Sequence, residues 1–367
     1  MATVQYQFDA RPVPLPTPGR SLAGVAVADI TPPPGMPKAG YSANAHSGQG
    51  ILTRLKARVF FFSAENGQHL AIVQLDLLGG SLLAHQRVLE LVGDELGLAA
   101  SGLMLGATHT HAGPGQYVSS EFYNQHASNR GGFDPDYLEF LSQQIATALR
   151  QAHQSRQPAR VATGTLAVWG LTRNRSLLPH VHNPRPRVRS QAGHAPLYAI
   201  DPRLSMLLVE TDPEAGPPQV LGALLTFAMH ATGISQSNDE YHGDIWGYLC
   251  RSAQQAFAQQ HPGHAPIVVG CMEGTHGDVA PAIAVGAANV REARRVGEAL
   301  AARALQLIGQ LRGQGQRLHS LPQALHILDV QQQSDLPEPA IGLTLLAGAT
   351  ENYTPVIHRL PPFRAGS

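Results

Sequence analysis

The alternation of hydrophobic and polar residues predicts strands and helices along most of the chain. Two short β-rich runs, RLKARVFFFSA and HLAIVQLDLL, are separated by a Glu-Asn-Gly turn, which favours a hairpin. Apolar residues recur at helical spacing in LLAHQRVLELVGDELGL, PDYLEFLSQQIATALRQA and REARRVGEALAARALQLIGQL, and WGYLCRSAQQAFAQQ is also predicted to be a helix. The predicted strands are GLMLGATHTH, PIVVGC, a late ALHILDV, and residues 160–168, 204–210 and 219–229.

Strands and helices alternate along the chain, with hairpins between some of them. This order predicts an α/β fold in which a mixed β-sheet core is flanked by helices. Residues 11–37 form a Pro-rich lead-in to the predicted elements. Residues 112–134 and 172–202 are rich in Pro, Gly and Asn and lack periodicity. Long irregular loops in a compact domain are usually functional or disordered, and both of these adjoin chemically interesting residues.

The composition is that of an ordinary globular protein, and it narrows the class of ligand. Of the residues, 43% are hydrophobic and 14% are charged. A chain of 367 residues is long enough for one large domain or two modest ones. Lys and Arg total 26, as do Asp and Glu, so the formal net charge is zero. A neutral chain has no long-range attraction to nucleic acid or to an anionic membrane. We therefore expect a small-molecule or lipid substrate.

The cysteine count and the length of the apolar runs indicate where in the cell the chain is expected. Cys250 and Cys271 are the only cysteines, which excludes a disulfide framework but not a single bridge. No apolar run reaches the length of a membrane span, and the first residues lack the pattern of a secretion signal. The chain as given is therefore predicted to be cytoplasmic, unless a leader was removed. The sequence leaves its oligomeric state open.

The first candidate site is GATHTHAGPGQY, residues 106–117, in which two histidines follow an apolar run. On a strand, His109 and His111 are two positions apart and point to the same face. Two imidazoles at a strand end can bind a zinc ion, or can place one metal ligand beside one acid/base group. They can also be loop histidines that are hydrogen-bonded to neighbouring hydroxyls.

A second strand end repeats this arrangement. His230 closes the apolar strand LLTFAMHATG, and His242 and Asp244 follow near the start of a helix. A lone histidine at a strand end is more often structural, but two strands that both end in histidine favour a shared site. Asp244 suits a helix cap as well as it suits a role in the site.

The last candidate segment is GCMEGTHGDVAP, which begins where the strand PIVVGC stops. It brings Glu273, His276 and Asp278 together among glycines. Glycines let the backbone approach a ligand closely and present its N–H groups. A tight turn rich in turn-forming residues explains the same composition.

The order of these motifs resembles the neutral/alkaline, non-lysosomal ceramidase family, in its N-terminal catalytic domain. The resemblance begins at ADITPPPGMPKAGY and GILTRLKARVFFF, and continues through GATHTHAGPGQY, NRSLLPHVHNP, TFAMHATG, HGDIWGYL and GTHGDVAP. It reaches PAIGLTLLAGATEN, so it covers nearly the whole chain from residue 24 onward. THTHxGPG is the most specific motif, and the ordered set is more specific than any one member.

The resemblance implies a zinc amidohydrolase that splits the amide bond of N-acylsphingosine. By position, His109 and His230 match zinc ligands, and His111 matches the active-site histidine beside the metal. Arg175 matches a substrate-contacting arginine, and Gly40 lies where the family places backbone close to the lipid head group. A zinc ion held by neutral imidazoles polarises an amide carbonyl and lowers the pKa of bound water, and a neighbouring histidine can pass a proton to the leaving amine.

Two departures from the family pattern affect the expected mechanism. The family motif GDVSP reads GDVAP here, so Ala280 replaces the serine proposed as nucleophile, while Asp278 is retained and is expected to act in catalysis. Without the hydroxyl we expect turnover through metal-activated water and not through an acyl-enzyme. The family's other zinc ligands, a Glu and a Tyr, lie in segments without a counterpart in this chain. Two ligands make a poor zinc site, so the candidates for a third are His111, His242, Asp244 and His276.

The leading hypothesis is a zinc-dependent amidohydrolase similar to neutral ceramidase, acting on N-acylsphingosine or a related N-acyl lipid. The alternatives are a hydrolase of another amide or ester that uses metal-bound water, and a non-catalytic ligand-binding relative. We expect an N-terminal extension at residues 1–23, a catalytic domain at 24–350 and an extended Pro-rich tail at 351–367. The chain is expected to be truncated or to lack part of the site, with a wide exposed cleft over the metal. Neither a nucleic-acid partner nor a transmembrane segment is expected, and members of the resembling family are often secreted.

Overall fold

The computed structural model describes residues 18–321 except 215 and 285. The longer strands of this part are β1 (Leu22–Asp29), β3 (Lys56–Ser63), β4 (His69–Leu75), β5 (Leu103–Ala107), β6 (Gln157–Ala167), β8 (Arg203–Thr211), β9 (Val220–Phe227) and β11 (Val268–Glu273). The short strands are β2 (Gly50–Ile51), β7 (Thr172–Asn174), β10 (Glu240–Tyr241) and β12 (Val279–Pro281). The helices are α1 (Leu82–Leu96), α2 (Glu121–His126), α3 (Pro135–Gln154), α4 (Leu177–Val181), α5 (Ala195–Tyr198), α6 (Asp244–Gln260) and α7 (Val290–Leu311).

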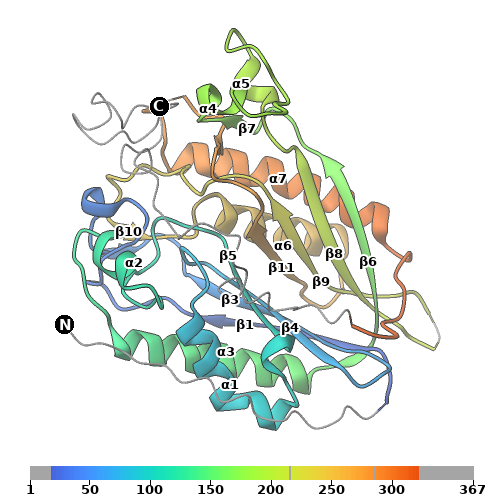
Figure 1. The fold of residues 1–367 in the computed structure, drawn as a ribbon. Coiled ribbons are helices and arrows are strands. Elements are labelled where there is room, and N and C mark those ends of the chain that lie inside the picture. The colour runs from blue at the N-terminus through green and yellow to red at the C-terminus, as the bar shows by residue number, and fades with distance from the viewer. Residues whose placement is uncertain (1–17, 215, 285, 322–367) are drawn as a thin grey trace.

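Eight strands form one mixed sheet that folds into two stacked halves (Figure 1). The strand order is β11-β9-β8-β6-β1-β3-β4-β5. β1 pairs with β3 along its whole length but with β6 over only two positions, so the halves part from each other beyond this corner. The pairs β4/β5 and β9/β11 are parallel, and the other pairs of this sheet are antiparallel. The mixed α/β sheet predicted from the sequence is confirmed.

Helices cover the outer face of each half of the sheet. α1 and α3 pack on the half that contains β1, β3, β4 and β5, and α6 and α7 pack on the other half (Figure 1). The inner faces meet around Phe60, Phe62 and Met272. Phe61 faces the helices, so both faces of β3 are buried, and this explains its unbroken apolar run. Gly106 permits the close stacking, because a Cβ there would lie 2.2 Å from the sulfur of Met272.

Most elements agree with their sequence-based predictions. β3 and β4 form the predicted hairpin, and the four predicted helices are present as α1, α3, α6 and α7. The irregular segment 112–134 contains only the short α2, and 172–202 contains only β7, α4 and α5. The predicted late strand ALHILDV and the predicted tail 351–367 lie outside the described residues. Of the described helices, none is both long and apolar enough to cross a bilayer.

β1 is the one long strand that the sequence pattern misses, since it falls inside the Pro-rich lead-in at 11–37. It occupies a central position between β3 and β6. Its residues are small because α3 passes directly over it: a Cβ on Gly24 would lie 2.0 Å from the carbonyl oxygen of Ala152. A strand built largely from Ala, Gly and Val gives a weaker hydrophobic signal than its phenylalanine-rich neighbour β3.

Candidate metal centre

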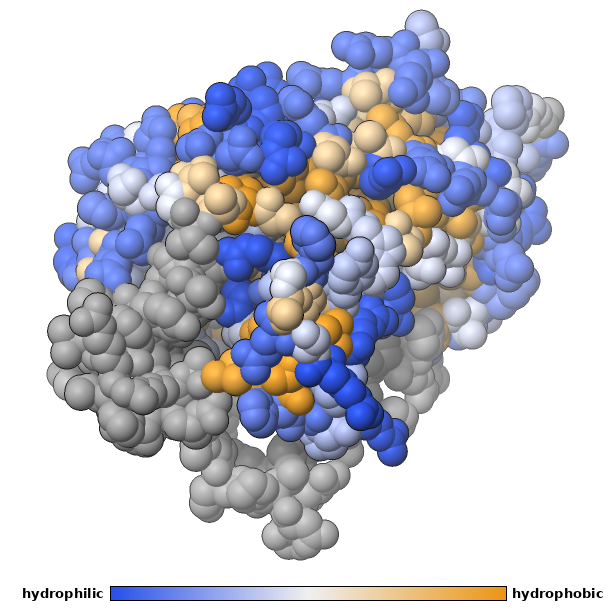
Figure 2. Space-filling view, turned by 90° about the horizontal axis from the view of Figure 1, so that it is seen from above, coloured by the Kyte–Doolittle hydropathy of each residue, from blue (hydrophilic) through white to orange (hydrophobic). Residues whose placement is uncertain are grey.

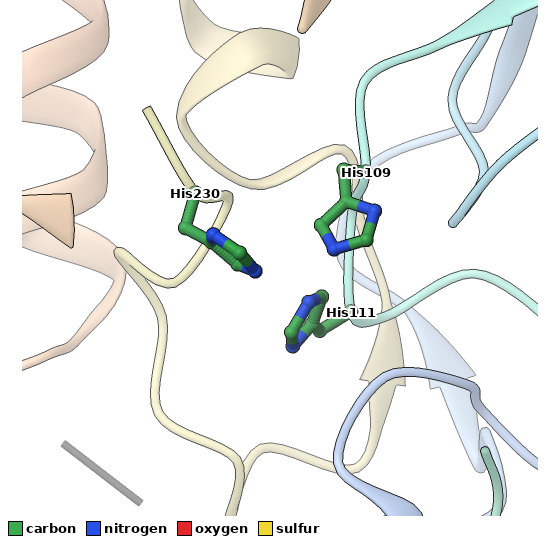
Figure 3. A group of neighbouring side chains, drawn as sticks. All are labelled: His109, His111 and His230. Atoms are coloured by element: carbon green, nitrogen blue, oxygen red, sulfur yellow. The ribbon is translucent and has the colours of Figure 1, made fainter. Parts of the chain in front are cut away.

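Three histidines meet at one end of the sheet, where strands from its two halves come together. His109 and His111 follow β5, and His230 follows β9 in the other half. An isolated parallel bridge between Thr110 and Ala231 joins the two segments beyond the strand ends. The three side chains point toward one another, although they come from distant parts of the sequence (Figure 3).

The three imidazoles form a compact group. The ring centroids are 4.9 Å apart for His109 and His111, 4.7 Å for His109 and His230, and 5.2 Å for His111 and His230. One ring nitrogen from each histidine lies within 4.8 Å of the other two. The expected convergence of His109 and His230 is confirmed, and His111 is the candidate third ligand that joins them. His111 and His230 are only 7% and 6% exposed, in contrast to the wide exposed cleft expected here.

The backbone at His109 and His111 is not the extended strand that the sequence predicts. β5 ends at Ala107, and His109 has a φ angle of 54°. The prediction that GLMLGATHTH is a strand to its end is therefore wrong over its last residues. A left-handed residue with a Cβ costs about 1–3 kcal/mol, which the surrounding structure must offset. His109 and His111 still share the site because the turn at His109 redirects the chain.

Main-chain carbonyl groups fix the tautomers of two of these imidazoles. Nδ1 of His109 lies 2.7 Å from the carbonyl oxygen of Leu78, and Nδ1 of His230 lies 3.1 Å from that of His276. A carbonyl oxygen only accepts, so each Nδ1 carries the proton and each Nε2 keeps its lone pair. Both ring nitrogens of His111 are buried and have no hydrogen-bond partner in the part of the chain that the structure describes.

Burial keeps the three imidazoles neutral. It lowers the pKa of His109 to about 4, and the positive charge of Arg175 and the neighbouring His276 add to this effect. Burial also lowers the pKa of His111 and of His230 well below the ordinary value for histidine. Neutral imidazole is the form that binds a metal ion. The three imidazoles are therefore in the protonation state that a metal ion would require.

Arg175 lies against the group, held there by β7 and the loop before β12. Its backbone N–H donates to the carbonyl of Asp278, and its guanidinium donates to the carbonyl of Gly277. Nη2 of Arg175 also donates to Nε2 of His230 over 3.1 Å. The carboxylate of Asp278 accepts from the side-chain amide of Asn174 at 2.7 Å, so Asp278 braces the residue that directly precedes Arg175. A substrate contact by Arg175 and a catalytic role for Asp278 stay predictions.

His276 adjoins the three-histidine group without belonging to it. Its ring lies 4.5 Å from that of His109 and 4.6 Å from that of His230. Its Nδ1 lies 3.4 Å from a carboxyl oxygen of Glu273, whose other oxygen accepts from the indole N–H of Trp246. Burial raises the pKa of Glu273 well above its ordinary value. This pair forms the wall of the site on the side of β11.

Gly40 packs directly on the ring of His111. Its φ angle is 119°, and a Cβ there would lie only 2.4 Å from Cγ of His111. The ring of Tyr41 meets the same imidazole edge-on, with the centroids 4.7 Å apart. Gly40 therefore sets the position of His111, while contact with a substrate head group stays a prediction.

Ala280 is the middle residue of β12. This strand pairs with β7 and also accepts the backbone N–H of His230, at the carbonyl of Val279. Ala280 is 1% exposed. It lines a cavity of about 210 Å³ whose walls also include Tyr41, Thr232, Ser235, Gln236 and Ile283. A methyl group thus faces this cavity where the resembling family carries a hydroxyl.

Asp244 and His242 support the loops around the site. The carboxylate of Asp244 accepts the N–H of Ile245 at 2.7 Å and two N–H groups of the turn after His230, at 2.9 and 3.1 Å. Asp244 therefore anchors both the helix start and that turn. The carbonyl of His242 accepts from the hydroxyl of Thr110 at 2.8 Å. The positioning roles of Thr110, Tyr41 and Trp246 had no signal in the sequence, because each acts through a contact formed only in the fold.

Comparisons with known proteins point to one family. Residues 22–301 match the family described as neutral/alkaline non-lysosomal ceramidase, N-terminal. Neutral ceramidase B of Dictyostelium discoideum is 28% identical over 248 residues, which cover 66% of this chain and 33% of that protein. Neutral ceramidase of Pseudomonas aeruginosa is 31% identical over 218 residues, which cover 57% of this chain and 30% of that protein.

The fold has a solved counterpart. The crystal structure of neutral ceramidase from Pseudomonas aeruginosa superposes with a TM-score of 0.68 at 26% sequence identity. The superposition covers 79% of this chain and 45% of that one. The chain spans about a third of the length of the curated relatives that it matches.

Proposed function

The chain belongs to the neutral/alkaline non-lysosomal ceramidase family, and from this premise we propose that it is a zinc-dependent amidohydrolase. The proposed substrate is N-acylsphingosine or a related N-acyl lipid, because the relatives named above are neutral ceramidases. The observation that carries the proposal is the group formed by His109, His111 and His230, in which one ring nitrogen of each lies within 4.8 Å of the others.

The donor set suits a zinc ion. Catalytic zinc sites usually have three protein ligands, and neutral imidazole is a common one. His109 and His230 each bond through Nδ1 to a carbonyl, the outer contact that orients metal-bound histidines. His111 brings two buried nitrogens without a partner in the described structure, and such a group costs about 1–3 kcal/mol unless something satisfies it. We therefore assign His111 as the third ligand; the acid/base role predicted for it is the competing assignment.

The surrounding residues provide the rest of the proposed chemistry. Zinc, when bound, supplies Lewis-acid polarisation of the substrate carbonyl. Nε2 of His230 has one lone pair, so a bound ion would replace the hydrogen bond that Nη2 of Arg175 donates to it. The guanidinium also donates to the carbonyl of Gly277, which keeps it beside the group, and a cation there would stabilise the negative charge that develops on the amide oxygen. Ala280 offers no hydroxyl, so no acyl group is carried at that position.

Metal content and hydrolysis, measured on the same preparations, test the proposal. The wild-type protein should bind about one zinc ion per chain and cleave N-acyl lipids in a chelator-sensitive manner. His109→Ala, His111→Ala and His230→Ala should each lose zinc. His276→Ala is the matched control and should retain it, because this ring adjoins the group without belonging to it.

Each departure from these results has a distinct meaning. Absence of zinc at micromolar free metal contradicts the metal centre. Zinc-loaded protein that cleaves only other amides or esters supports a different hydrolase, and inactivity on every substrate supports a ligand-binding relative. If His111→Ala keeps its zinc but loses hydrolysis, His111 is the acid/base group and not a ligand.

A further inference from the structure

The chain segment that connects β6 to β8 carries exposed arginines and aromatic residues of which the proposed function makes no use. We propose that this segment docks the protein on an anionic lipid bilayer. The docking surface is defined by Trp169, Leu178, Arg185, Arg187, Arg189 and Tyr198. The inference goes beyond the proposed hydrolysis and does not depend on it, because binding to a bilayer is measurable without any turnover.

Residues 172–200 carry a net positive charge, although the whole chain is neutral. Residues 172–200 contain five arginines and neither Asp nor Glu. The rest of the chain therefore holds 21 of the 26 Lys and Arg residues against all 26 acidic ones. Arg185, Arg187 and Arg189 are all exposed. The zero net charge thus hides a local positive region, and basic side chains beside a membrane attract its anionic lipids.

Exposed apolar side chains accompany the arginines. Trp169 is 48% exposed, Tyr198 57% and Leu178 38%, and the rings of Trp169 and Tyr198 lie 5.9 Å apart. Trp and Tyr favour the interface between water and lipid, where the ring is buried and its polar atom stays hydrated. Nη1 of Arg187 donates to the carbonyl of Ile200, which ties the arginine run to the end of α5 where Tyr198 lies.

This surface stands next to the metal centre. α4 and α5 project from one end of the molecule, beside β7 (Figure 1). Figure 2 looks down on that end, where hydrophobic and strongly hydrophilic side chains lie side by side. β7 pairs with β12, and Arg175, directly after β7, contacts His230. A bilayer docked here would hold lipid close to the three-histidine group.

The combination favours a bilayer over a soluble polyanion. A polyanion such as RNA requires only the arginines, and its affinity comes mainly from phosphate contacts. Trp169, just before residues 172–200, and Leu178 and Tyr198 within that range are exposed and add contact area that suits a lipid interface.

Vesicle binding and tryptophan fluorescence test the proposal on the full chain. The protein should sediment with vesicles of equal parts phosphatidylglycerol and phosphatidylcholine at low salt, and weakly or not at all with phosphatidylcholine alone. The chain has only two tryptophans, and Trp246 is fully buried, so a blue shift on binding reports on Trp169. Brominated lipid should quench that part of the emission.

Two double variants that remove the same charge test how much the arginines of the docking surface contribute to vesicle binding. Arg185→Gln with Arg189→Gln should weaken binding to anionic vesicles about 30-fold, since each basic residue near the surface contributes about a fivefold factor. Arg187 is left in place because it bonds to the backbone. Arg87→Gln with Arg150→Gln removes the same charge from α1 and α3 on the opposite layer and should leave binding unchanged.

Three outcomes would overturn the proposal. The first is no binding to anionic vesicles at low salt. The second is an equal loss of binding in both double variants. The third is binding without any change in Trp169 emission, together with equal affinity for single-stranded RNA, which would assign the arginines to a polyanion. Loss of zinc or of hydrolysis bears on the proposed function alone and leaves the vesicle result unaffected.

Discussion

Substituting Gly40 is the sharpest test of how the backbone positions His111. Gly40→Ala adds one methyl group, and the Cβ would lie 2.4 Å from Cγ of His111. Ordinary contact begins at 3.4 Å, so the imidazole must retreat by about 1.0 Å. Metal–ligand distances tolerate only about 0.2 Å. We therefore expect a 10–100-fold loss of zinc affinity, with hydrolysis falling in parallel.

Gly35→Ala is a matched control for the backbone strain of this substitution. Gly35 has a φ angle of 112°, close to the 119° of Gly40, and nothing lies within 4 Å of its Cβ position. Both variants should therefore lose a similar 1–3 kcal/mol of stability from the left-handed backbone, with an added contribution from the clash at Gly40. Only Gly40→Ala should lose zinc affinity.

The assay is urea unfolding for stability and chelator competition for zinc affinity, on the same three proteins. Circular dichroism of Gly40→Ala should match the wild type, because the clash involves one side chain beside the site. If both variants bind zinc as tightly as the wild type, Gly40 does not set the position of His111, or His111 is not a ligand.

Three further predictions concern the core, the acid range and the reaction. Arg58 and Asp76 form a buried ion pair at 2.9 Å, so Arg58→Met should lower the free energy of unfolding in urea by about 3–5 kcal/mol. Adding Asp76→Asn to that variant should recover part of the lost stability, and a double variant no more stable than Arg58→Met would refute this. Burial lowers the pKa of His242 to about 3, below the 6.5 of the unfolded chain, so the unfolded state binds the extra proton and stability falls as the pH drops below 6.5. His242→Gln should remove a part of that slope that grows from about half of 1.4 kcal/mol per pH unit at pH 6.5 to nearly all of it at pH 5, and an unchanged slope would count against it. Hydrolysis should show no burst phase, whereas Ala280→Ser should raise the rate if the rest of the site is intact; a burst or a trapped acyl-protein in the wild type would contradict this.

Local pattern determines most elements of this fold. The spacing of apolar residues identifies α1, α3, α6 and α7, and the turn between β3 and β4 identifies the hairpin, because helical and strand periodicity are properties of neighbouring residues. The same pattern places a histidine after each of two strands. This pattern does not identify β1. Its Gly24 and other small residues are required because α3 packs directly over the strand, and α3 lies far from β1 in the sequence.

The tertiary structure decides which residues make up the candidate metal centre. The sequence nominates His109 and His230, and leaves His111, His242, Asp244 and His276 as alternatives for a third ligand. The stacking of the two halves of the sheet and the left-handed turn at His109 bring His111 into the group and assign His242 and Asp244 to the supporting loops.

The contacts that orient the histidines are the feature that the sequence predicts least. The carbonyl of Leu78 fixes the tautomer of His109, and Gly40 packs on His111 across a gap of some seventy positions. Every residue has the same backbone carbonyl, so which carbonyl accepts from an imidazole depends only on where the backbone lies in the fold. The sequence by itself determined which side chains could bind a metal, and the tertiary structure decided which of them meet, because their meeting depends on contacts between strands far apart in the chain.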